Sequence, residues 1–310
     1  LFAFSCAMVA LSCAAIYAVA RDWPFLQRRD IWIMLSGFIL ANTVMTGTQF
    51  GERDQYVALG LLPFVLVQIA TTYGLPYPKW MKWPVLFGGA VLIFLKPHHG
   101  LIPTLLLGHR MFARRRWMIL RDPDFIALAV TTSLYIAAAW FFFNDYVRGI
   151  LPDVVLLYTA LREEKTAAVL TLLYFCMLFA LFLFPFLSTG MDRRKKNLIL
   201  FLTGCAMLSL IPFYVQGMAF AYHLFPAFSF ASCALALQIS WFTQKFLRPG
   251  PGLIAALIVL GCFFYILRPL KPEFPRHGDY AALPLTQLVQ RCKGQEHCSF
   301  FMFHPNMGVV

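Results

Sequence analysis

Three short polar segments interrupt an apolar chain, and each carries side chains that can bind ions or move protons. The first segment places Glu52, Arg53 and Asp54 next to one another. Neighbouring carboxylates can bind a metal ion or act as a general base. The same three charges could instead form a local ion pair on a solvated turn. Both interpretations stay open for this segment.

The second segment holds Lys96, followed by Pro97, His98 and His99. An ammonium group near the membrane interior is costly unless an anion neutralises it. We expect a lipid phosphate to be that anion, with His98 or His99 as a further hydrogen-bond donor. The alternative is that Lys96 simply extends its ammonium group to the lipid headgroups.

The third segment contains Gln216, Tyr222 and His223, which are polar groups near the middle of a long apolar run. The predicted turn presents these three side chains on the same outward face. A Tyr–His pair at a membrane surface can also be an ordinary part of the interfacial aromatic belt. The occurrence of two other polar segments favours a shared site.

The composition shows that lipid must cover much of this chain. Of its 310 residues, 60% are hydrophobic and 13% are charged, and the mean hydropathy is +0.69. Few soluble folds could bury that much apolar surface. Since a helix needs about 20 residues to cross the hydrocarbon layer, charge-free runs predict the spans. The runs are 1–20, 31–51, 56–78, 125–144, 166–191, 197–244 and 249–267. The run 197–244 is long enough for two spans.

The region 83–109 is predicted to be a helical hairpin with Lys96 at its tip. A single helix would hold an ammonium group and a helix-breaking proline at its centre. With a hairpin, most Lys and Arg residues, Arg110 and Lys195 among them, fall in loops on one side of the membrane, which is the pattern of cytoplasmic loops. The three polar segments then face the opposite side. Basic loops near anionic lipids also explain the net charge of +12 without a nucleic-acid partner.

The predicted fold is an all-α polytopic membrane protein with about ten transmembrane or re-entrant helices over residues 1–268. Residues 269–310 are expected to begin a short periplasmic α/β segment, with a helix at 281–291 and a strand at 299–303. The chain opens inside a hydrophobic run and stops within this segment, so further residues are expected at both ends.

Two cysteines, Cys292 and Cys298, lie in the polar C-terminal segment. A short Cys-x5-Cys loop in an oxidising compartment favours a disulfide. A metal site that includes His297 and His304 is the alternative, although its spacing matches no familiar ligand pattern.

The order and spacing of these motifs resemble the integral-membrane glycosyltransferases of the GT-C superfamily. The resemblance covers residues 45–230. Its first motif is residues 50–54, followed by residues 61–64. The second is residues 96–98, followed by Pro103 and Arg114–Arg116. The third consists of Gln216-Gly217 and Tyr222-His223, followed by Pro226.

The resemblance implies an enzyme that transfers a sugar from a polyprenyl-phosphate donor to a glycan, lipid or protein acceptor. It implies a bacterial inner membrane location, with the active site on the periplasmic face, and allows a divalent cation, Mg²⁺ or Mn²⁺. The implied catalytic residues are Glu52 and Asp54, with the main base expected in an outer loop before residue 1. Lys96, His98, His99 and Arg53 would bind the donor phosphate, and Gln216, Tyr222 and His223 the substrate.

Two other classes of membrane protein remain as alternatives. A transporter or lipid flippase would be expected to place its ionisable groups near the middle of the membrane. A polymerase or ligase of lipid-linked glycans would be expected to have a longer outer loop rich in arginine than residues 144–165 provide.

Overall fold

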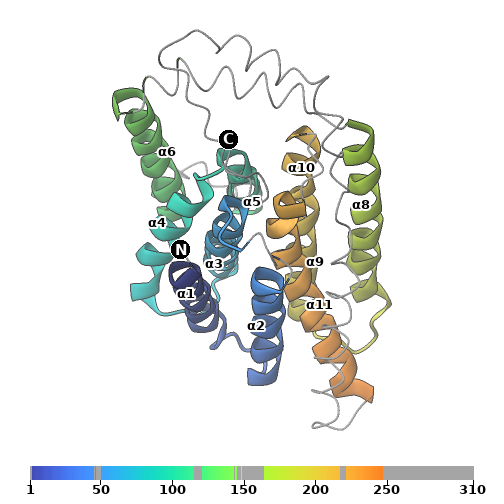
Figure 1. The fold of residues 1–310 in the computed structure, drawn as a ribbon. Coiled ribbons are helices and arrows are strands. Elements are labelled where there is room, and N and C mark those ends of the chain that lie inside the picture. The colour runs from blue at the N-terminus through green and yellow to red at the C-terminus, as the bar shows by residue number, and fades with distance from the viewer. Residues whose placement is uncertain are drawn as a thin grey trace.

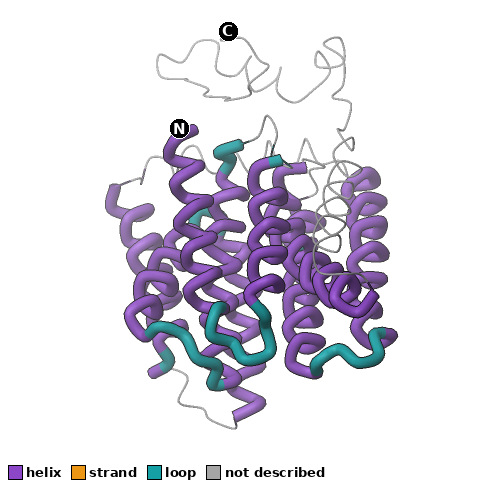
Figure 2. Tube along the Cα trace, turned by 90° about the horizontal axis from the view of Figure 1, so that it is seen from below, coloured by secondary structure: helices purple, strands orange, loops and turns teal. Residues whose placement is uncertain are grey.

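The computed structural model describes residues 2–44, 46, 50–114, 121–142, 144, 148, 164–216 and 221–246. Every regular element in this part of the chain is a helix (Figures 1 and 2). The elements are α1 (Phe2–Ala20), α2 (Arg28–Thr43), α3 (Arg53–Tyr73), η2 (Lys79–Met81), α4 (Lys82–Ile93), η3 (Pro97–Gly100), α5 (Leu101–Arg114), α6 (Pro123–Phe142), α8 (Glu164–Leu187), α9 (Arg193–Leu208), α10 (Leu210–Gln216), η6 (Ala221–Leu224) and α11 (Phe225–Phe246).

Six helical segments of the described chain are long and apolar enough to cross a membrane. They are Phe2–Ala20, Arg53–Tyr73, Pro123–Phe142, Ala168–Leu187, Arg193–Val215 and Tyr222–Phe246. The prediction of an all-helical, multi-pass membrane protein is therefore confirmed for the described residues. The count of about ten helices stays a prediction. The span at 249–267, the α/β segment and the Cys292–Cys298 disulfide lie outside the described residues.

The helices pack side by side into one bundle, with α3 and α11 near its centre and α6 and α8 at opposite edges (Figure 1). Within the apolar windows of these helices, 83% of residues in α3 and 78% in α11 are buried, against 17% in both α6 and α8. Protein therefore surrounds α3, whereas α6 and α8 turn most of their surface outward, where their apolar side chains suit lipid.

A pair of glycines brings α3 and α4 into close contact. A Cβ atom added to Gly89 of α4 would lie 2.9 Å from the carbonyl oxygen of Gly60 in α3, and one added to Gly60 would lie 2.6 Å from Cβ of Leu92. Small residues let helix backbones approach closely in membranes. This contact fixes α4 beside the first half of α3, and thereby fixes the hairpin tip that follows α4.

The predicted hairpin is present as α4, the short helix η3 and α5. Lys96 lies just before η3, and Pro97 occupies the first position of η3, where its missing N–H leaves no hydrogen bond unmade. After the tip, α5 runs back along α3. The Gln68 amide of α3 donates a hydrogen bond to the Pro103 carbonyl oxygen of α5 at 3.0 Å and ties the two helices together.

The helix α2 is shorter than the predicted run 31–51, since it ends at Thr43. The Thr46 hydroxyl donates to the Thr43 carbonyl oxygen at 2.8 Å. Such a side-chain hydrogen bond competes with continuation of the helix. Hydropathy alone does not detect this competition, because threonine is only weakly polar.

Candidate functional site

The three polar segments singled out from the sequence meet at one end of the bundle. Asp54 lies in the first turn of α3, Lys96 at the hairpin tip and His223 in η6. The Lys96 ammonium nitrogen is 2.6 Å from the Asp54 carboxylate and 2.9 Å from Nδ1 of His223. His223 Nδ1 lies 3.4 Å from the same carboxylate. Residues separated by up to 169 positions therefore form one polar cluster.

The start of α3 is held by a hydrogen-bonded turn that orients Asp54. The backbone N–H of Gly51 donates to the Gln55 side-chain oxygen at 2.6 Å. The Gln55 amide in turn donates to the carbonyl oxygen of Asn42, in α2, at 2.6 Å. Gly51 has a φ of 94°, a conformation that residues with a Cβ rarely adopt. A carboxylate in the first turn, such as that of Asp54, is also favoured by the helix dipole.

The hairpin tip turns Lys96 and His99 into the protein and leaves His98 at the surface. Lys96 is 8% exposed and His99 is 1% exposed, whereas His98 is exposed. The two imidazole rings are in contact, with centroids 4.6 Å apart. One turn of 3-10 helix thus gives the two histidines different environments.

Lys96 is enclosed by groups that stabilise a cation. In addition to Asp54 and His223, the ring of Tyr222 lies 5.4 Å from the ammonium nitrogen, within the range of a cation–π interaction. Asp54 supplies an anion to Lys96 within the chain, and the expectation that a lipid phosphate also binds Lys96 stays a prediction. The alternative, extension of Lys96 to the headgroups, does not match the structure, because the side chain is buried.

His99 is the least satisfied member of the cluster. Neither ring nitrogen has a partner within hydrogen-bond distance, and Nε2 lies 3.8 Å from an Asp54 carboxylate oxygen. Burial lowers the pKa of His99 below its ordinary value, although the Asp54 carboxylate acts in the opposite direction. A buried polar group without a partner costs about 1–3 kcal/mol. His99 therefore places two ring nitrogens without hydrogen-bond partners beside the buried pair of Asp54 and Lys96.

The remaining predicted site residues lie at the edge of this cluster or away from it. Glu52 is the N-cap residue of α3 and is half-buried. Arg53 is exposed and does not join the buried cluster. Gln216 ends α10, and its side chain lies outside the described residues. The structure thus brings together Asp54, Lys96, His99, Tyr222 and His223, with Glu52 next to them in the chain.

The cluster does not provide a ready site for a divalent cation. No group of three or more His, Cys, Asp or Glu side chains in the described part of the chain is arranged to hold a metal ion. The position beside the Asp54 carboxylate is filled by the Lys96 ammonium group. These residues therefore do not fit Mg²⁺ or Mn²⁺, and no step below depends on a metal.

Two further buried ion pairs lie at the opposite end of the bundle, and the sequence analysis missed both. Lys195 is 2.8 Å from the Asp30 carboxylate, and Arg110 pairs with Asp124 and, at 3.2 Å, with Asp122. The sequence analysis placed Arg110 and Lys195 in basic loops on one side of the membrane, and the structure shows that both are buried, at 3% and 5% exposed. The available signal was an Asp in the first turn of a largely apolar helix, Asp30 in α2 and Asp124 in α6.

The Asp30 carboxylate differs from that of Asp54 in being surrounded by structural donors. Besides Lys195, it accepts hydrogen bonds from the backbone N–H of Gln27 at 2.8 Å, the hydroxyl of Ser240 at 2.6 Å and the amide of Gln244 at 3.2 Å. It joins α2, α9 and α11. A fully satisfied carboxylate of this kind holds helices together and leaves no position for a ligand.

Comparisons with known proteins leave the family open. No family model matches the chain, and no curated protein or solved structure matches it.

Proposed function

We propose that this protein is a membrane glycosyltransferase that transfers a sugar from a polyprenyl-phosphate donor to a periplasmic or lipid-linked acceptor. The observation that carries the proposal is the buried meeting of Asp54, Lys96, His99 and His223, which come from three distant segments. These are the same segments on which the resemblance to GT-C glycosyltransferases rests. In this proposal the protein resides in the bacterial inner membrane, and the cluster faces the periplasm.

The charges of the cluster suit a reaction in which a phosphate group leaves. The ammonium of Lys96 is held in a mostly dehydrated position, where its interaction with an anion is stronger than in water. A preorganised cation stabilises the negative charge that develops on a leaving phosphate oxygen. His99 has unpartnered ring nitrogens beside this position, and so it can donate a hydrogen bond to the same phosphate.

The proposed reaction is a displacement at the anomeric carbon. An oxygen of the acceptor hydroxyl forms the new bond to that carbon while the bond to the phosphate oxygen breaks, and the electron pair stays on the phosphate. Lys96 and His99 stabilise that phosphate. The acceptor's proton passes to a carboxylate, and Glu52 is the half-buried carboxylate nearest to the cluster in the chain. Asp54 keeps Lys96 in position, because it is already paired with it.

A transfer assay with reconstituted protein tests this proposal. Liposomes containing the full-length protein would receive radiolabelled polyprenyl-phosphate hexoses and pentoses, with membrane extract as the source of acceptors. The parent protein should move label to an acceptor and release polyprenyl phosphate. A parent protein that is folded but moves label from none of these donors would contradict the proposal, and transport of the intact donor across the bilayer would favour a flippase instead.

The matched pair of variants is Lys96→Met and Lys195→Met, because each removes one ammonium group from a buried ion pair. Only Lys96→Met should reduce transfer per folded molecule, by about 10²–10³-fold, as expected when a charge-stabilising donor is lost. Equal losses in the two variants would show that Lys96 has only a structural role.

A further inference from the structure

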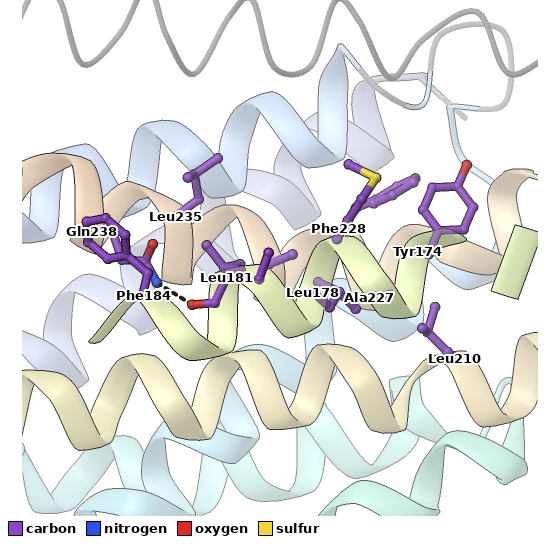
Figure 3. Close-up of a pocket in the computed structure, with 12 residues that line it drawn as sticks. Tyr174, Leu178, Leu181, Phe184, Leu210, Ala227, Phe228, Leu235 and Gln238 are labelled. Atoms are coloured by element: carbon purple, nitrogen blue, oxygen red, sulfur yellow. Dashed lines mark hydrogen bonds between the residues drawn. The ribbon is translucent and has the colours of Figure 1, made fainter. Parts of the chain in front are cut away.

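An apolar cavity lies between α8 and α11, and the proposed reaction at the Lys96 cluster makes no use of it. Its volume is about 270 Å³. Twelve residues line it, and most of these are Leu, Ala, Phe and Met side chains (Figure 3). The volume is just below the range of about 300–1,000 Å³ typical of sites that enclose a whole small molecule. The cavity therefore suits a segment of a longer apolar molecule.

The cavity begins next to the candidate site and extends away from it. Ala227 and Phe228 line one end, and they follow His223 by only four and five residues. Gln238 lines the other end, where its amide donates to the Leu181 carbonyl oxygen at 2.8 Å and ties α11 to α8. Gln238 follows Ala227 by eleven residues, which corresponds to about 16 Å of helix.

One side of the cavity reaches the surface that faces lipid. Ala180 lines the cavity and is itself exposed on α8, which is the helix at the edge of the bundle (Figure 1). A hydrocarbon chain can therefore enter from the bilayer beside Ala180 and lie along α11 while its headgroup remains near His223.

We propose that this cavity binds the isoprenoid chain of the lipid-phosphate donor, and this inference rests on the proposed function. The position of the cavity, one helical turn from His223, allows a phosphate at Lys96 and the chain attached to it to be bound together. Three of the lining residues are alanines, Ala180, Ala227 and Ala231, among larger Leu, Phe and Met side chains. A lining of mixed side-chain size suits the branching methyl groups of an isoprenoid.

Two tryptophan variants on the same helix test the inference. Ala180→Trp narrows the cavity at its exposed rim, and Ala168→Trp places the same side chain at an exposed position of α8 that does not line the cavity. With a long-chain polyprenyl-phosphate sugar, Ala180→Trp should raise KM about tenfold or more with little change in kcat, and Ala168→Trp should match the parent. With a donor of two isoprene units in place of the long chain, the parent and Ala180→Trp should have similar KM values.

A photocrosslinking measurement separates this inference from the proposed function, because it needs no turnover. A polyprenyl phosphate with a photoreactive group near its phosphate end should label α8 or α11 in the parent and much less in Ala180→Trp. A photoreactive phosphatidylcholine should not label the cavity. If sugar transfer is observed but neither KM nor labelling changes in Ala180→Trp, or if phosphatidylcholine labels the cavity equally, the inference is overturned while the proposed function stands. If no transfer occurs in the parent, the proposed function fails first.

Discussion

The ion pair between Asp54 and Lys96 buries two charged side chains, and membrane proteins normally avoid the free-energy cost of burying a charge. Both side chains are buried, and each would be an uncompensated charge if the other were removed. Removing one partner of a buried pair typically costs about 3–5 kcal/mol, whereas replacing both partners with neutral groups is often close to neutral for stability. The pair can therefore be removed as a unit.

The double variant Asp54→Asn with Lys96→Met is predicted to be folded and inactive. Its thermal midpoint in detergent should lie close to that of the parent, because no buried charge is left unpaired. Its sugar transfer should fall by about 10²–10³-fold, since the developing phosphate charge loses its cation. Thermal unfolding and the transfer assay are the two measurements. A double variant that keeps parental activity would show that this pair takes no part in the reaction.

At the other end of the bundle, Lys195→Met is predicted to reduce stability without reducing specific activity. The cost should fall near the lower end of about 3–5 kcal/mol, because Asp30 keeps the donors Gln27, Ser240 and Gln244. Detergent thermal shift would measure the loss. Activity per folded molecule should equal that of the parent, and a selective fall in activity would instead link this ion pair to the reaction.

At the scale of helices, the Gly60–Gly89 contact positions the hairpin and hence Lys96. Gly89→Ala is predicted to destabilise the protein by about 1–3 kcal/mol, since the added Cβ would be forced against the Gly60 carbonyl oxygen. Gly88→Ala is the matched control, because a Cβ there meets nothing within 4 Å. Thermal unfolding of both variants should separate them, and equal midpoints would mean that α3 and α4 tolerate a wider spacing.

The membrane helices were largely predictable from the sequence because lipid imposes a simple rule on composition and length. The runs at 1–20, 56–78, 125–144 and 166–191 correspond to α1, α3, α6 and α8. The early end of α2 was not predictable in the same way, since it depends on a hydroxyl hydrogen bond at Thr46. Local polarity therefore indicates which helices exist, and specific hydrogen bonds determine where they stop.

The candidate site was predictable as a set of segments but not as a set of contacts. Residue types and helix directions indicated that the segments of Asp54, Lys96 and His223 share one face. The ion pair of Lys96 with Asp54 was missed, because sequence spacing does not show which of several anions lies within 3 Å. The inward turn of His99, as opposed to His98, depends on the phase of one 3-10 turn.

At the scale of the whole molecule, the buried ion pairs lie at two opposite ends of the helical bundle. Asp54, Lys96 and His223 lie at one end, whereas the Arg110 and Lys195 ion pairs lie at the other. We predict that a cysteine at Leu95, which is 39% exposed, reacts with a membrane-impermeant maleimide added from the periplasm. A cysteine at Trp80, which is 72% exposed, should react only from the cytoplasm. Both would be introduced into a background without native cysteines, and labelling of Leu95→Cys from the cytoplasm alone would reverse the proposed orientation.

The central position of α3 also constrains how the protein is assembled during synthesis. Its first turn carries the Asp54 carboxylate, and the neighbouring imidazole of His223 is translated roughly 170 residues later. The helix α11, which helps to enclose α3, follows His223 in the chain. Until that late segment is inserted, the nascent bundle must hold α3 with earlier helices, mainly α1, α4 and α5, and must tolerate a gap along one flank. We therefore expect ribosome-bound intermediates ending before residue 221 to be the form most dependent on membrane insertases and most exposed to quality-control proteases.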